Sequence, residues 1–178
     1  MLEGIIRESI GKKGTKALRR DGYLIANIYG KGLENINAAF KENEYIRTVR
    51  NKETLAFSVN VAGKEMDVVV QSYESHPLTG KLLHVDLMVA QPGVVTHFMV
   101  PVEPVGEAIG LKNKGLVNVA KKRLRVQAKI EDLPKSIVID VTEMDVGDSK
   151  LIRDIATTDN VRFTDADRVS VLSIIKAK

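Results

Sequence analysis

The stretch from Arg7 to Lys31 carries the residues best suited to ligand chemistry in this chain of 178 residues. Its first fourteen positions hold six basic side chains, which are Arg7, Lys12, Lys13, Lys16, Arg19 and Arg20. Lysine and arginine neutralise phosphates, and the two glycines among them would let backbone N–H groups approach a phosphate closely. The pattern therefore predicts a phosphate-binding segment, and the alternative is a solvated loop with an ordinary excess of lysine.

A helical turn and a strand must position these cations. We expect a short helix over Thr15–Arg20, capped by Thr15 and ended by Gly22. In the strand Tyr23–Tyr29, alternation predicts a core face formed by Leu24, Ala26 and Ile28. The opposite face presents Tyr29, which could stack on a base or pack on a ribose. Cations beside such a strand favour nucleic acid as the ligand.

A second polar group is expected on the strand Lys81–Ala90. Its core face would be formed by Leu83, Val85, Leu87 and Val89. His84 and Asp86 then point together to the other side, about 7 Å apart. The pair could contact nucleic acid, could support a surface hairpin, or could join His76 in a metal or acid–base site. The sequence offers no third or fourth metal-ligating residue at a spacing typical of a metal site. Nucleic-acid contact therefore ranks first and metal binding ranks last.

Composition limits the remaining functions. The absence of cysteine excludes disulfides, thiolate zinc sites and cysteine nucleophiles. The net charge of +4 is local, because residues 1–33 hold seven basic and three acidic side chains. The amino terminus has no long apolar run, which predicts no signal peptide, no membrane segment and a cytoplasmic location. No P-loop, G-x-S-x-G or H-E-x-x-H motif occurs, so we expect no enzyme, no cofactor and no metal.

Two β-rich domains are expected. Aromatic residues form only 4% of the chain, so the cores must be built from valine, isoleucine and leucine, which favour strands. The pattern breaks at Pro92–Gly93, which predicts domains over residues 1–91 and 94–178. Short apolar runs separated by turns predict an all-β sandwich-like second domain. The cluster Lys121–Arg125 within it is either a charged edge strand or a second contact surface.

Three stretches resemble a known family. They are the pattern R-x4-K-x6-R-R-x8-Y-G from Arg7 to Gly30, the stretch SHPLTGKLLHVDL from Ser75 to Leu87, and Ile137–Ile155. The first two resemble the bacterial large-subunit ribosomal protein L-twenty-five family. The third is similar to the carboxy-terminal domain of its long form, also called general stress protein Ctc. The resemblance covers nearly the whole chain.

The resemblance implies a mainly β fold with a few short helices. An antiparallel β-barrel of the ribosomal 5S-RNA-binding type would precede the second β domain. It implies a structural role in the large ribosomal subunit during translation, with binding to the loop E region of 5S rRNA and a link to stress. The protein would be associated with the ribosome, and it would be a monomer when it is not bound there. Its second domain would contact neighbouring ribosomal proteins or ribosomal RNA.

The implied RNA contacts come from the basic stretch and from three strands. Carried over by position, they are Arg7, Lys12, Thr15, Lys16, Arg19, Tyr29, Gln71, His84 and Asp86, to which the basic stretch adds Lys13 and Arg20. Gln71 is expected on the strand Lys64–Tyr73, on the face opposite its core residues. Lys16, Ile25 and Asn27 depart from the family's usual arginine, proline and aliphatic residue.

Two alternatives to 5S rRNA binding stay open. The anticodon-binding barrels of glutaminyl-tRNA synthetases resemble this family's fold, so transfer RNA is a conceivable ligand. A metal-dependent hydrolase would instead use His76, His84 and Asp86.

Overall fold

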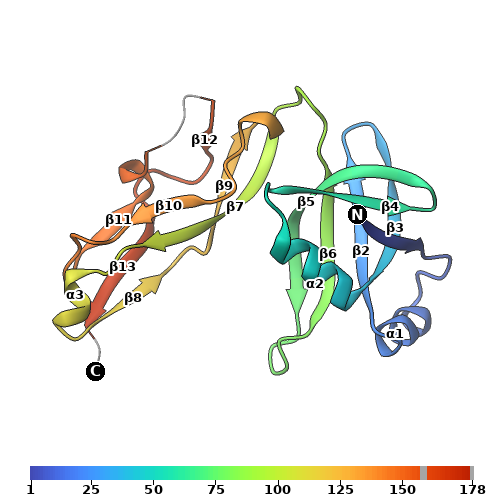
Figure 1. Ribbon diagram of the computed structural model, residues 1–178, viewed down its shortest axis with the longest axis horizontal. Helices are drawn as coiled ribbons and strands as arrows, with labels where there is room; N and C mark the ends of the chain where they lie inside the picture. Colours follow the sequence, from blue (N-terminus) through green and yellow to red (C-terminus); the bar gives the residue numbers. More distant parts are fainter. Residues whose placement is uncertain (157–159, 177–178) are drawn as a thin grey trace. The chain divides into compact units, whose positions relative to one another are not determined.

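β-Strands are the main secondary structure of the chain, as its runs of valine, isoleucine and leucine predict. The computed structural model describes residues 1–156 and 160–176 (Figure 1). It divides into two compact units, Met1–Val94 and Val95–Lys178. Within the described residues, no helix is long and apolar enough to cross a membrane. The mainly β fold class predicted from the sequence is confirmed.

Six strands close the first unit into a barrel, in the order β1-β3-β2-β6-β5-β4. Their bounds are β1 Leu2–Ile6, β2 Tyr23–Gly30, β3 Leu33–Lys41, β4 Ala56–Val61, β5 Lys64–Ser75 and β6 Leu82–Val89. The β1–β4 and β2–β6 pairs run parallel, so the strand directions are mixed rather than purely antiparallel as expected. Parallel neighbours cannot be joined by a hairpin, and long segments of chain separate the members of both pairs.

Two helices accompany the barrel, α1 over Lys12–Arg20 and α2 over Glu42–Asn51. The expectation of a helix starting at a Thr15 cap is wrong, because α1 already begins after Gly11 and Thr15 lies inside it. Gly22 ends α1 as predicted, since its φ of 81° lies in the left-handed region that glycine adopts freely. The apolar stripe of α2, formed by Tyr45, Ile46 and Val49, packs against the barrel core.

The barrel core follows the predicted alternation except at the start of β6, where Leu82 rather than the predicted Leu83 packs against it because the pairing with β5 shifts there. Its buried side chains include the inward residues of β2 and β6, which are Leu24, Ala26, Ile28, Val85 and Leu87. Phe40 and Phe57 fill the same core from β3 and β4. Because these positions face inward, the residues between them are directed to the outside of the barrel. Packing of the core therefore determines which residues of β2 and β6 lie on the outer face of the barrel.

The β4–β5 turn contains a strained residue, because Ala62 has a φ of 52° before Gly63 at 79°. An L-residue in this region carries a strain of about 1–2 kcal/mol, which asparagine tolerates better. We expect Ala62→Asn to raise the unfolding free energy of the barrel by about 0.5–1 kcal/mol. Urea unfolding followed by tyrosine fluorescence measures it, since all four tyrosines lie within residues 1–94. A β-branched Ala62→Val as stable as the asparagine variant would contradict the strain.

In the part that the structure describes, the second unit contains two β-sheets, with strand orders β10-β7-β9-β12 and β11-β13-β8. The strands are β7 Thr96–Val105, β8 Gly115–Val119, β9 Arg123–Ala128, β10 Ile137–Asp140, β11 Ser149–Leu151, β12 Arg162–Phe163 and β13 Ser170–Lys176. Helix α3 spans Ile109–Lys112, and 3-10 turns span Ile130–Asp132 and Ile152–Asp154. The short α3 and β12 escaped prediction because so few residues leave no periodicity to detect.

Candidate nucleic-acid interface

Arg19 fastens α1 to the barrel. Its guanidinium donates two hydrogen bonds to the main-chain oxygen of Leu83 in β6, at 3.1 Å from Nε and 2.8 Å from Nη2. A guanidinium has five N–H donors, so this bonding leaves three of them for other partners. Arg19 is therefore first a positioning residue, whereas the sequence suggested a phosphate contact.

Arg7 makes a second contact with the same helix. Its Nη2 donates to the hydroxyl oxygen of Thr15 at 2.7 Å, and the side chain is buried at the end of β1. Burial lowers the pKa of Arg7, and the positive charge of Arg19 lowers it further. Arginine stays charged in proteins, so the site holds two neighbouring cations. Thr15 thus orients an arginine, and the buried Nε of Arg7 keeps no partner among the described residues.

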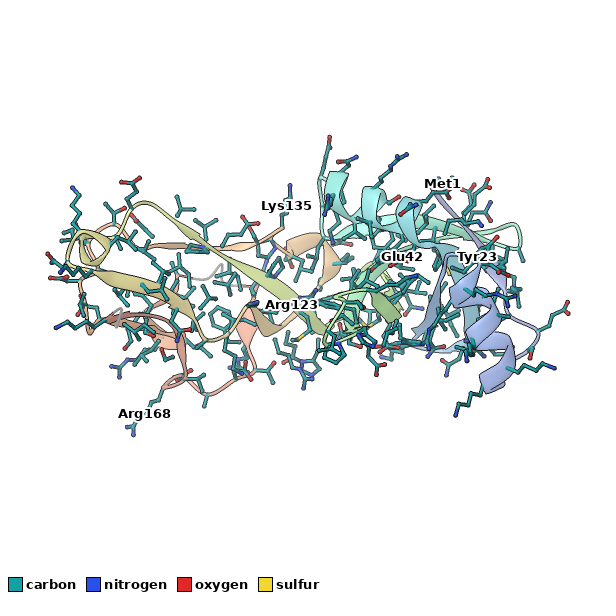
Figure 2. All side chains as sticks on the ribbon, turned by 90° about the horizontal axis from the view of Figure 1, so that it is seen from below. Met1, Tyr23, Glu42, Arg123, Lys135 and Arg168 are labelled. Carbon is teal, nitrogen blue, oxygen red and sulfur yellow. The ribbon has the colours of Figure 1, made fainter. Side chains whose placement is uncertain are left out.

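The remaining cations of α1 face the solvent. Lys12, Lys13 and Lys16 are exposed, and within the described residues no hydrogen bond or ion pair holds them. The side chain of Arg20 is 82% exposed and lies 3.6 Å from a carboxylate oxygen of Asp21. Figure 2 shows nitrogen-tipped side chains projecting from α1 away from the barrel strands. These four cations are the ones placed to meet an external anion.

A row of polar residues crosses the outer face of the barrel beside this helix. Asn37 of β3 pairs with Asn27 of β2, Asn27 pairs with Asp86 of β6, and Asp86 pairs with Ser72 of β5. At the other end of the row, the backbone N–H of Arg7 donates a hydrogen bond to the main-chain oxygen of Asn37 at 2.8 Å. We call Arg7, Asn37, Asn27, Asp86 and Ser72 the polar row. Asn37 and Ser72 were missed because strand register cannot be read from one sequence.

Asp86 connects the polar row to the other predicted contacts. One carboxylate oxygen lies 3.5 Å from Nδ1 of His84, and the other accepts a hydrogen bond from the Ser72 hydroxyl. Tyr29 lies nearby, and its pKa is raised first by burial and then by the negative charge of Asp86. The structure thus brings Tyr29, His84 and Asp86 together on one face, as the alternation in both strands indicates.

Gln71 lies in an irregularity of β5. Val70 pairs with Leu87 and Ser72 pairs with Asp86, so Gln71 is an extra residue between two consecutive pairs. Such a bulge shifts the alternation, and Ser72 rather than Gln71 lies opposite Asp86. In a bulge two residues of one strand oppose one residue of the partner, so the outward placement of Gln71 stays a prediction. The buried Oε1 of Gln71 has no hydrogen-bond partner in the described part of the chain.

His76 does not join His84 and Asp86. Its Nδ1 accepts hydrogen bonds from the backbone N–H groups of Leu78 and Thr79, at 3.3 Å each. His76 therefore stabilises the turn between β5 and β6. Among the residues that the structure describes, no group of three or more histidines, cysteines and carboxylates could hold a metal ion. The hydrolase alternative consequently has no supporting geometry.

The environment of Tyr29 predicts a pH effect. Burial and then the charge of Asp86 raise its phenol pKa above the usual 10.0. The folded chain holds this proton more tightly than the unfolded chain. The contribution of Tyr29 to the free energy of unfolding is therefore complete below its pKa in the unfolded chain. This contribution is lost as the pH rises through its pKa in the folded chain.

We expect Asp86→Asn to lower the pKa of Tyr29 while leaving it above 10.0, because burial, the larger cause, remains. Titration by NMR of ring-labelled tyrosine measures this pKa, and Tyr29→Phe assigns the signal. An unchanged pKa in Asp86→Asn would show that the carboxylate does not act on the phenol.

Comparisons with known proteins agree along the whole chain. The sequence model of the Ribosomal L25p family matches residues 2–87, and that of the ribosomal protein TL5 C-terminal domain matches residues 95–178. The protein named large ribosomal subunit protein bL25 in Sulfurimonas denitrificans is 78% identical over the full length of both chains. Those of Nitratiruptor sp. and Campylobacter lari are 61% and 59% identical, again over both full lengths. The chain belongs to the ribosomal L25 family, in its long two-domain form.

Proposed function

We propose that this chain is a structural component of the large ribosomal subunit that binds 5S rRNA at its loop E region. The supporting observation is the position of Tyr29, His84 and Asp86 on one barrel face, beside a helix whose lysines remain exposed. The protein works in translation, on the ribosome in the cytoplasm, and it is not an enzyme.

The two parts of the site supply different kinds of interaction. The cations of α1 neutralise phosphates and release counterions, which gives affinity for any RNA. His84, Asp86 and Tyr29 can bond base edges and 2′-hydroxyls or stack on a base, which gives selectivity. A broad strand face suits the wide, shallow minor groove of RNA, and loop E is the region whose irregular shape it would recognise.

The second unit extends the contact with the ribosome. Arg125 is exposed on β9, between the buried residues Leu124 and Val126, and Arg162 is exposed on the neighbouring β12. Arg123, labelled in Figure 2, lies on the same strand face as Arg125. This face would contact neighbouring ribosomal RNA or ribosomal proteins. Away from the ribosome the protein would be a monomer, and its association with the ribosome would respond to stress.

Competition binding tests the proposal. We expect 5S rRNA to displace labelled 5S rRNA from the full chain at far lower concentration than transfer RNA or a plain RNA duplex does. Replacing Lys12, Lys13 and Lys16 by alanine should reduce the slope of log K against log salt by about 2–3, as three phosphate contacts are lost. Equal competition by transfer RNA would contradict 5S recognition.

A charge-matched variant controls for net charge. Replacing Lys112, Lys129 and Lys135 by alanine removes the same three charges from exposed positions of the second unit. This variant should keep the salt slope within about one unit of the wild type. A slope reduced as much as in the α1 variant would mean that overall charge, and not α1, binds the RNA.

A further inference from the structure

Two carboxamides occupy the middle of the polar row. Asn27 and Asn37 are directly paired between the antiparallel strands β2 and β3. Asp86 is the neighbour of Asn27 on one side, and Arg7 is bonded to the backbone of Asn37 on the other. The amides therefore lie between an anion and a cation, at the centre of the face described above.

Neither carboxamide is used by the protein itself. Within the described part of the chain, no hydrogen bond is made by the side chain of Asn27 or of Asn37, and both are half-buried. Their backbone groups belong to a closed sheet, since β2 lies between β3 and β6 and β3 lies between β1 and β2. The side-chain amides, each with two donors and one acceptor oxygen, are what these central strands can offer to a ligand.

Buried apolar residues flank this pair, with His84 in one neighbouring row and Tyr29 in the other. Ile25 and Ala39, which pair with each other, are 2% and 0% exposed, and Met88 beside Tyr29 is 9% exposed. The two carboxamides therefore lie between the buried pair Ile25 and Ala39 and the half-buried Tyr29, as in a site that recognises one narrow feature of its ligand.

We propose that Asn27 and Asn37 read the minor-groove edge of one guanine in the bound RNA. This inference rests on the proposed function and names the chemistry of its selectivity. In the minor groove, a pair with guanine adds an amino donor to the acceptors that every pair presents. A carboxamide oxygen accepts from that amino group while a neighbouring NH2 donates to an acceptor of the same pair. An A·U pair lacks the donor and leaves an amide oxygen unpaired.

A panel of 5S rRNA transcripts tests the inference. In each transcript, one G·C pair within the region protected by the protein is replaced by A·U. For the wild-type chain, one replacement should weaken binding by about tenfold or more, and the others should have smaller effects. Asn27→Ala with Asn37→Ala should bind the unaltered RNA about tenfold more weakly and should lose the sensitivity to that replacement. Asn43→Ala, an exposed amide removed from α2, is the matched control and should behave as the wild type.

The possible results separate two failures. If the wild type does not prefer 5S rRNA to transfer RNA, the proposed function and this inference fall together. If it does, but the alanine variant keeps its affinity and its response to every replacement, only the inference is overturned. A uniform loss across the panel would also overturn base reading. Threonine at both positions suits a strand, so this variant gives the same test if the alanine variant does not fold.

Discussion

Arg19→Ala is expected to weaken binding of 5S rRNA by about 2 kcal/mol, or roughly thirtyfold. The two hydrogen bonds from Arg19 to the Leu83 oxygen hold α1 against β6, and alanine removes both. Without this tie, Lys12, Lys13 and Lys16 are no longer held beside the polar row. The affinity is therefore lost through several phosphate contacts that depend on one arginine. Filter binding at fixed salt measures the loss.

Arg20→Ala is the matched control, because it removes the same charge from the adjacent position. Arg20 is mostly exposed and, among the described residues, forms an ion pair with Asp21 alone, so its loss should cost less than about 1 kcal/mol. Arg19→Lys should fall between the two, since lysine keeps the charge but lacks the planar fork. If Arg19→Ala and Arg20→Ala weaken binding equally, Arg19 is one more phosphate contact and does not position the helix.

Phe40→Ala is expected to destabilise the barrel by about 3–5 kcal/mol. Phe40 is fully buried in β3, and a Cβ added at Gly4 of β1 would lie only 2.4 Å from its ring. The ring therefore fills the space where β1 and β3 pack, and its removal leaves a cavity there. The polar row crosses these same strands, so a loosened barrel should also lose RNA affinity at temperatures near its melting point.

Urea unfolding followed by tyrosine fluorescence measures this loss in the first unit alone, because the second unit contains no tyrosine. Leu78→Ala is the control, since Leu78 is 91% exposed in the β5–β6 turn. Its unfolding free energy should stay within about 0.5 kcal/mol of the wild type. A loss below about 1 kcal/mol in Phe40→Ala would mean that the core can close around the missing ring.

Alternation alone predicted the parts of the site that depend on local periodicity. In β6, valine and leucine at every second position directed His84 and Asp86 to one side, and the structure keeps both there. The same reasoning placed Tyr29 outward on β2. When one face of a strand is buried, the residues between the buried ones must lie on the opposite face. These placements could therefore be predicted without knowing the neighbouring strands.

Long-range pairing could not be predicted in the same way. Arg19 donates to a main-chain oxygen 64 residues away. Every residue has such an oxygen, so the acceptor cannot be identified from the residue types. The polar row depends on the register of four strands, which one sequence does not contain. The bulge at Gln71 adds one residue to β5 and places Ser72 opposite Asp86. Thr15, read as a helix cap, instead receives a hydrogen bond from Arg7.

Hydroxyl-radical footprinting of 5S rRNA by the full chain tests the central claim most directly. Protection should be confined to the loop E region and should appear at low protein concentration. With Asp86→Ala, that protection should need at least tenfold more protein, while binding to a plain duplex should stay nearly unchanged. Protection scattered along the RNA, or an equal loss of affinity for loop E and for the duplex, would contradict specific recognition by this face.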